Sequence, residues 1–200
     1  MEIDKEQPNR AARGESVRER VLDAAERLLR DGKADFSMRD LAAAAQVSFA
    51  TPFNHFGSKA AIMHALSARR IDRMMSHLAE TAPAGDARKR VLRAMDIAVR
   101  IMLEEPAVNR SVMSWLGTTG STPGQVLAHS TAFWAMALAD AEGLVANGNA
   151  AALRALPEQL AFAFRGVLSF WTSGELPDDA LPDRARDIAH GLLLGFATPV

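Results

Sequence analysis

SMRDLAAAAQVSFATPFNHFGSK (residues 37–59) contains two short helical segments separated by a tight turn. Ser37 is a favourable N-cap residue, and Asp40 stands three positions later, where its side chain can close a capping box. Small apolar residues follow as far as Ala45, so another helix can pack closely over this segment. Residues 46–47 then predict the turn. This pattern is the outline of a helix-turn-helix unit, whose last helix lies in the DNA major groove.

The segment after the turn is unusual because it carries a proline within a predicted helix. Ser48 is predicted to cap this helix, which reaches Phe56 and ends at Gly57. Pro52 is then the fourth helical residue. Its missing N–H costs less there than in a helix interior, but it predicts an irregular first turn.

The rest of the chain shows helical spacing of apolar residues and no strand pattern, which predicts an all-α fold. A first helix is predicted to begin at Ser16, with Glu19 completing a capping box, and to stop at Asp31-Gly32. A longer helix follows the opening stretch over about 58–80. The further predicted helices cover about 86–103, 107–115, 125–146, 157–173 and 182–196.

The composition is that of an ordinary globular protein and excludes several classes of site. The 200 residues are 48% hydrophobic and 24% charged. The absence of cysteine excludes disulfides and thiolate metal sites. No apolar run reaches the length of a membrane helix, and the first residues are not a secretory signal, so we expect a cytoplasmic protein without a membrane partner. No catalytic motif stands out, and we expect neither enzymatic activity nor a cofactor.

Charge is distributed unevenly along the chain. Residues 1–93 carry 17 Lys and Arg against 13 Asp and Glu, whereas residues 94–200 carry 6 against 11. A basic front half favours a polyanionic partner there.

Residues 37–66 resemble the DNA-binding signature of the tetracycline-repressor (TetR) family of bacterial transcription regulators, and the resemblance extends over residues 16–66. A match at many spaced positions is specific. Residues 1–15 show no periodicity and are predicted to form a flexible arm. The resemblance implies a helix-turn-helix domain over 16–60 with a linking helix to about 80, and a ligand-binding and dimerisation domain over 84–200. The positions that match in register are Ser37, Leu41, Ala42, Ala45, Val47, Ser48, His55, Phe56, Ser58 and Lys59.

The chain departs from the family pattern within the same stretch. Gln46 and Ala50 replace common glycines, Pro52 replaces a leucine, and Phe53 replaces a tyrosine whose hydroxyl typically contacts phosphate. We therefore expect Phe53 to stack on the nucleic acid or to pack inward. Phe49 either meets a thymine methyl in the groove or covers the turn, and the sequence leaves both open.

The resemblance also assigns roles to side chains along this stretch. Thr51 matches the position that usually faces the groove, and Ser58 and Lys59 match positions that grip phosphate. His55 is a candidate phosphate donor, and Arg39 a candidate for the backbone or the groove edge. The predicted DNA-contacting residues are Ser37, Arg39, Ser48, Phe49, Thr51, Phe53, His55, Ser58 and Lys59.

Two further sets of residues are predicted in the C-terminal half, where the resemblance implies a ligand pocket and a dimer made by the last two helices. Simple core packing is the alternative for both sets, and Arg165 is equally suited to a salt bridge across a dimer. The pocket candidates are Met113, Trp115, His129, Phe133, Trp134, Met136, Phe164 and Arg165. The dimer candidates are Phe162, Leu168, Trp171, Ile188, Leu192 and Phe196.

The resemblance implies a homodimeric repressor that a small-molecule effector releases from a palindromic operator in double-stranded DNA. Two alternatives stay open on the sequence. One is a DNA-binding dimer that takes no ligand. The other is a helical enzyme with an incidental helix-turn-helix.

Overall fold

A computed structural model of the chain describes residues 10–81, 85–117, 125–145 and 150–196, with side chains from Ser16 onward. Within these ranges it contains nine α-helices, one short 3-10 helix and no strand, which confirms the predicted all-α fold. The elements are α1 (Arg10–Arg30), α2 (Met38–Ala44), α3 (Ala50–Phe56), α4 (Lys59–Thr81), α5 (Ala87–Glu104), α6 (Pro106–Ser114), η1 (Trp115–Gly117), α7 (Gln125–Leu138), α8 (Ala150–Thr172) and α9 (Leu181–Leu194).

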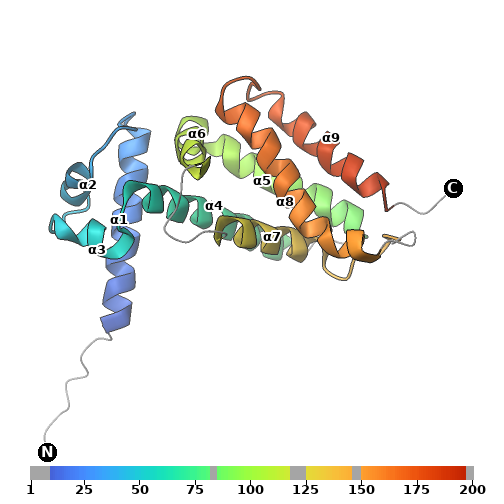
Figure 1. Ribbon diagram of the computed structural model, residues 1–200, viewed down its shortest axis with the longest axis horizontal. Helices are drawn as coiled ribbons and strands as arrows, with labels where there is room; N and C mark the ends of the chain where they lie inside the picture. Colours follow the sequence, from blue (N-terminus) through green and yellow to red (C-terminus); the bar gives the residue numbers. More distant parts are fainter. Residues whose placement is uncertain (1–9, 82–84, 118–124, 146–149, 197–200) are drawn as a thin grey trace, which may run out of the picture.

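The helices form two groups joined by α4 (Figure 1). Helices α1, α2 and α3 stand at one end of the molecule, and α5 to α9 form a bundle at the other, with α9 on the side away from α4. None of the described helices combines the length and the apolar character that crossing a bilayer requires.

Each group has its own hydrophobic core, and α4 contributes to both. Its first half, including Ile62 and Leu66, packs with α1 to α3, whereas Ile71 and Met74 lie in the core of the bundle. Helix α6 also reaches the first core through Val108 and Val112. The cores therefore meet within α4, before the predicted boundary near residue 84.

The first helix is longer than predicted. It begins at Arg10 instead of Ser16, so the predicted Ser16–Glu19 capping box is wrong, and residues 10–15 of the predicted arm are helical. Arginine and alanine before Ser16 are strong helix formers, and they extend the helix through Gly14. Residues 1–9 of the predicted arm lie outside the described residues.

Two helices of the bundle differ from their predicted bounds. Helix α7 ends at Leu138, well before the predicted end near 146, because Ala139 and Ala141 adopt positive φ angles of 48° and 57°. Arg90 donates to the terminal carbonyl of Leu138 at 2.9 Å and so stabilises this end. Helix α8 begins at Ala150 and carries Pro157 inside it, although Pro157 was predicted to open the helix.

Candidate nucleic-acid interface and interhelical cavity

Helix α2 begins with the predicted capping box. The Asp40 backbone N–H donates to Ser37 Oγ at 3.2 Å, and the Ser37 backbone N–H donates to Asp40 Oδ2 at 2.8 Å. Ser37 Oγ also donates to this carboxylate at 2.8 Å. These bonds lower the pKa of Asp40 below its ordinary value. Ser37, a predicted DNA contact, thus uses its hydroxyl to fix the start of α2.

The turn after α2 is a Schellman motif built on a residue other than glycine. The Val47 N–H donates to the Ala42 carbonyl at 3.0 Å, and the Gln46 N–H donates to the Ala43 carbonyl at 3.1 Å. Gln46 holds the left-handed conformation with φ 54°. A side chain disfavours this conformation by about 1–2 kcal/mol, so the glycine common in the family is the less strained residue here.

Two arginines of α1 hold the same turn from the other side. Arg20 Nη2 donates to the carbonyls of Ala45 and Gln46, both at 3.1 Å, and Arg27 Nη2 donates to the Ala44 carbonyl at 3.1 Å. The last carbonyls of a helix lack intrahelical donors and carry partial negative charge, so both guanidinium groups are placed favourably. The orientation of α3 is thereby fixed relative to α1.

Helix α3 begins one residue later than predicted. Ala50 is its first residue, and Ser48 Oγ bonds Thr51 Oγ1 at 2.8 Å rather than capping a backbone N–H. Pro52 becomes the third helical residue, whose N–H has no intrahelical acceptor in any case. The buried Pro52 ring packs inward and costs no backbone bond at this position.

The outer face of the helix-turn-helix carries an aromatic patch, which we call the Phe49 patch and define as Arg39, Phe49 and Phe53. The Phe49 and Phe53 side chains are 53% and 42% exposed, and their rings meet edge to face with centroids 5.5 Å apart. The Arg39 guanidinium lies 5.6 Å from the Phe49 centroid. Phe49 therefore does not cover the turn, and Phe53 does not pack inward. His55 is exposed farther along α3.

Lys59, a predicted phosphate contact, has its ammonium turned toward the protein. Nζ donates to the carbonyls of Ala34 and Phe36 at 2.7 and 2.8 Å and lies 4.2 Å from the Phe36 ring centroid. Burial lowers the pKa of Lys59 below its ordinary value. Ser58 Oγ accepts from the Ala61 N–H at 3.1 Å and caps α4. Lys59 thus ties α4 to the segment that leads into α2.

A buried polar network connects this domain to the bundle. Arg70 of α4 is 6% exposed, and its guanidinium donates to Glu26 of α1 and to Asn109 Oδ1 of α6 at 2.9 Å. Asn109 Nδ2 donates to the carbonyls of Ile101 and Met102 at 3.1 and 2.9 Å. Desolvation lowers the pKa of Arg70 despite the Glu26 carboxylate. Helices α1, α4, α5 and α6 therefore meet at one set of hydrogen bonds.

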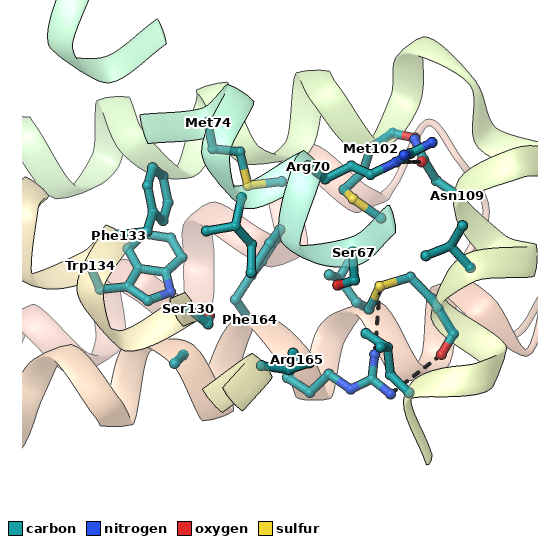
Figure 2. A pocket seen from close by; sticks show the side chains of 17 residues that line it. Ser67, Arg70, Met74, Met102, Asn109, Ser130, Phe133, Trp134, Phe164 and Arg165 are labelled. Atoms are coloured by element: carbon teal, nitrogen blue, oxygen red, sulfur yellow. Dashed lines mark hydrogen bonds between the residues drawn. The ribbon is translucent and has the colours of Figure 1, made fainter. Parts of the chain in front are cut away.

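The bundle encloses a cavity of about 60 Å³ between α4, α5, α6, α7 and α8. Figure 2 shows its lining, in which apolar side chains predominate. This volume admits a few water molecules and is smaller than the roughly 150 Å³ of a cavity known to bind benzene. The predicted pocket residues that line it are Met113, Phe133, Trp134, Phe164 and Arg165.

The other three predicted pocket residues lie outside the cavity lining. Trp115 packs against the first core, with its ring centroid 5.4 Å from Lys59 Nζ. His129 bonds Asp72 at 2.8 Å on the surface, and Met136 is exposed. The helical spacing of these residues in the sequence did not show whether each side chain lines the cavity, packs in the first core or lies on the surface. The cavity residues that sequence reasoning missed include Ser67, Arg70, Ile71 and Met74 of α4, which was predicted as a linking helix.

The last two helices present large apolar side chains to solvent. Of the residues predicted to form a dimer, Phe162 and Ile188 are 55% and 40% exposed, and Leu192 is partly buried. Leu168, Trp171 and Phe196 are buried in the core of their own chain, so they offer no surface to a second one. Sequence reasoning missed two exposed residues, Phe170 of α8 and Leu194 of α9, at 58% and 54%.

Comparisons with known proteins agree with this geometry. Residues 21–66 match the family described as bacterial regulatory proteins, tetR family, which confirms the resemblance over the helix-turn-helix. No curated protein matches the chain. A TetR transcriptional regulator from Rhodococcus sp. RHA1 shares the fold with a TM-score of 0.73 and 22% identity, over 90% of this chain and 97% of that one. A TetR family transcription regulator from Marinobacter aquaeolei VT8 is similar over 92% of this chain and 98% of that one, with a TM-score of 0.55 and 20% identity.

Proposed function

We propose that this chain is a DNA-binding regulator that acts as a homodimeric repressor and is released from a palindromic operator by a small molecule, because residues 21–66 match the tetR family of bacterial regulatory proteins. The observation that carries the proposal is the Phe49 patch. Two exposed aromatic rings and a guanidinium group stand on the outer face of a helix-turn-helix whose inner face is buried. Exposed rings of this size are otherwise unfavourable in water.

The patch suggests how bases are recognised. Phe49 and Phe53 have no hydroxyl, so they recognise thymine methyl groups by apolar contact rather than by hydrogen bonds. Arg39 and His55 supply the polar contacts beside them, and Thr51 is partly covered and shares its hydroxyl with Ser48. Lys59 acts mainly on the placement of α4, because its ammonium already has two carbonyl acceptors.

The exposed apolar face of α8 and α9 supports the dimer. Phe162, Phe170, Ile188 and Leu194 together would leave a large apolar surface in water if the chain stayed monomeric. Gly166 on α8 has open space where a side chain would stand, which lets another helix approach closely. Two-fold symmetry then implies two half-sites about 34–36 Å apart in the DNA.

The position of α4 supports the response to a ligand. Ser67, Arg70, Ile71 and Met74 of this helix line the cavity, while its first half lies in the core of the DNA-binding domain. A ligand that fits one tilt of α4 better than another shifts the distance between the two recognition helices. It does so only by its differential affinity for the two states.

Selection of binding sites from random duplexes by the full-length protein tests the proposal. We expect an enriched palindrome, with thymine in each half-site, whose binding weakens as salt rises. Phe49→Ala should lower affinity for this site, whereas Lys89→Ala, at an exposed position on α5, should leave it unchanged. Enrichment of a single half-site, or a monomer in sedimentation, would refute the dimeric repressor.

A further inference from the structure

The two arginines that line the cavity differ in whether a carboxylate neutralises them. Arg70 is neutralised by Glu26 and bonded to Asn109. Arg165 of α8, also in the lining, has no carboxylate partner among the described residues. Within the described ranges its guanidinium makes only long contacts, to the Met113 sulfur at 3.6 Å and to the Met113 carbonyl at 3.5 Å. Desolvation lowers the pKa of Arg165 with no opposing acidic neighbour.

Trp134 provides a second, independent donor in the cavity lining. Its side chain is fully buried and lines the cavity, yet its Nε1–H has no hydrogen-bond partner in the described part of the chain. A buried donor left unpaired costs about 1–3 kcal/mol. In Figure 2 the indole nitrogen lies on the ring edge nearest Ser130, and Arg165 lies well apart from Trp134.

Resting on the proposed function, we infer that the effector is a carboxylic acid with an apolar body and a hydrogen-bond acceptor distant from the carboxylate. Arg165 pairs with the carboxylate, the side chains between bind the apolar body, and Trp134 Nε1–H donates to the distant acceptor. A single planar guanidinium matches a monoanionic carboxylate, which accepts two parallel N–H bonds. A dianionic phosphate would need a second free cation, and the other arginine of the lining, Arg70, is already paired with Glu26.

The size of the ligand is limited by the cavity and extended by its methionines. At about 60 Å³ the cavity must widen to admit a chain of several carbons. Met74, Met102 and Met113 stand in the lining, and their unbranched side chains adapt to new shapes at low cost. Widening at Met74 displaces α4 directly, which is the displacement that the proposed release from DNA requires.

Calorimetric titration of the full-length protein with matched probes tests the inference. The probes are hexanoate, hexanamide and 5-oxohexanoate, together with octanoate, octanamide and 7-oxooctanoate. We expect each acid to bind at least about tenfold tighter than its amide, because hydrogen bonds to charged groups are the stronger ones. The oxo acids should bind severalfold tighter than the plain acids.

Four variants assign the contacts. Arg165→Gln should remove the preference for acid over amide, and Arg165→Lys should keep part of it. Arg154→Gln, at an exposed arginine of the same helix, should leave the preference for acid over amide and the preference for the oxo acids unchanged. Trp134→Phe should abolish only the preference for the oxo acids. Thermal unfolding followed by circular dichroism identifies any variant that fails to fold. The affinities of the wild-type protein for the six probes then test the inference without that variant.

The outcomes separate this inference from the proposed function. Equal affinity for acids and amides, tighter binding of the amides, or an unchanged preference in Arg165→Gln would overturn the carboxylate assignment. Failure of all six probes to bind would overturn it as well. In each case, operator binding measured without any probe decides separately whether the chain is a DNA-binding regulator.

Discussion

Glu26 is the carboxylate that neutralises the buried Arg70 guanidinium, so Glu26→Gln should destabilise the chain strongly. The Arg70 and Glu26 side chains are 7% and 14% exposed. A contact pair at an effective dielectric constant of about 20 interacts with about 4 kcal/mol. Removing one partner of a buried pair costs about 3–5 kcal/mol, because the other charge stays buried without compensation. We expect a loss in this range in the free energy of unfolding.

The matched control is Glu19→Gln, which removes another carboxylate of α1 from its pair with Arg69. These side chains are 45% and 21% exposed, so the expected loss is below about 1 kcal/mol. The measurement is urea unfolding followed by circular dichroism at one fixed protein concentration, because dissociation of the proposed dimer would make stability depend on concentration.

A second substitution separates charge from packing. If an uncompensated charge causes the loss, Glu26→Gln combined with Arg70→Met should be more stable than Glu26→Gln alone, since a buried pair replaced by apolar groups is often nearly neutral. Equal losses for Glu26→Gln and Glu19→Gln would refute the reasoning. So would a double variant no more stable than Glu26→Gln.

Further predictions concern substitutions at single positions. Gln46→Gly should raise the free energy of unfolding by about 1 kcal/mol by relieving the left-handed conformation, and Gln46→Ala, which keeps a side chain, should show no such gain in the same urea assay. In gel shifts, Phe49→Ala should reduce the ratio of operator affinity to random-DNA affinity, and the slope of log affinity against log salt concentration should stay unchanged. Arg39→Ala should reduce the magnitude of this slope by about one if Arg39 contacts phosphate. Burial lowers the pKa of Lys59 below 10.5, so the unfolded chain holds more protons than the folded chain between that lowered pKa and 10.5. The stability of wild type relative to Lys59→Met should therefore rise as the pH increases toward 10.5, and a fall would contradict the Lys59 geometry. Phe170→Glu should shift the protein to monomer in sedimentation velocity, and an unchanged dimer would place the interface elsewhere.

The helix-turn-helix was predictable because its signals are local. The Ser37–Asp40 capping box and the turn at Gln46 are readable from residues within a few positions of each other. The contacts that fix the unit in space were not. Lys59 reaches carbonyls 23 and 25 positions away, and Arg20 reaches the end of α2 from α1. Such side-chain-to-carbonyl bonds leave no periodic trace in the sequence.

The bundle was less predictable, because many of its helices carry two apolar faces. Trp171 and Phe170 are neighbours on α8, yet one is fully buried and the other is 58% exposed. Composition does not show which face meets the core. The end of α7 was missed for a related reason: alanine favours helix in general, but Ala139 and Ala141 take positive φ where Arg90 binds the last carbonyls.

The placement of α6 sets a condition for exchanging domains between relatives. Val108 and Val112 complete the core of the DNA-binding domain, while Met113 of the same helix lines the cavity. A chimaera joined after α4 would leave the first core without these two valines and would bring foreign side chains against it. A junction after α6, which transfers α1 to α6 as one block, keeps the first core intact, and the new contacts then fall in the bundle, where α5 packs against α7 and α9. The natural unit of exchange in this fold is therefore larger than the helix-turn-helix and ends within the bundle.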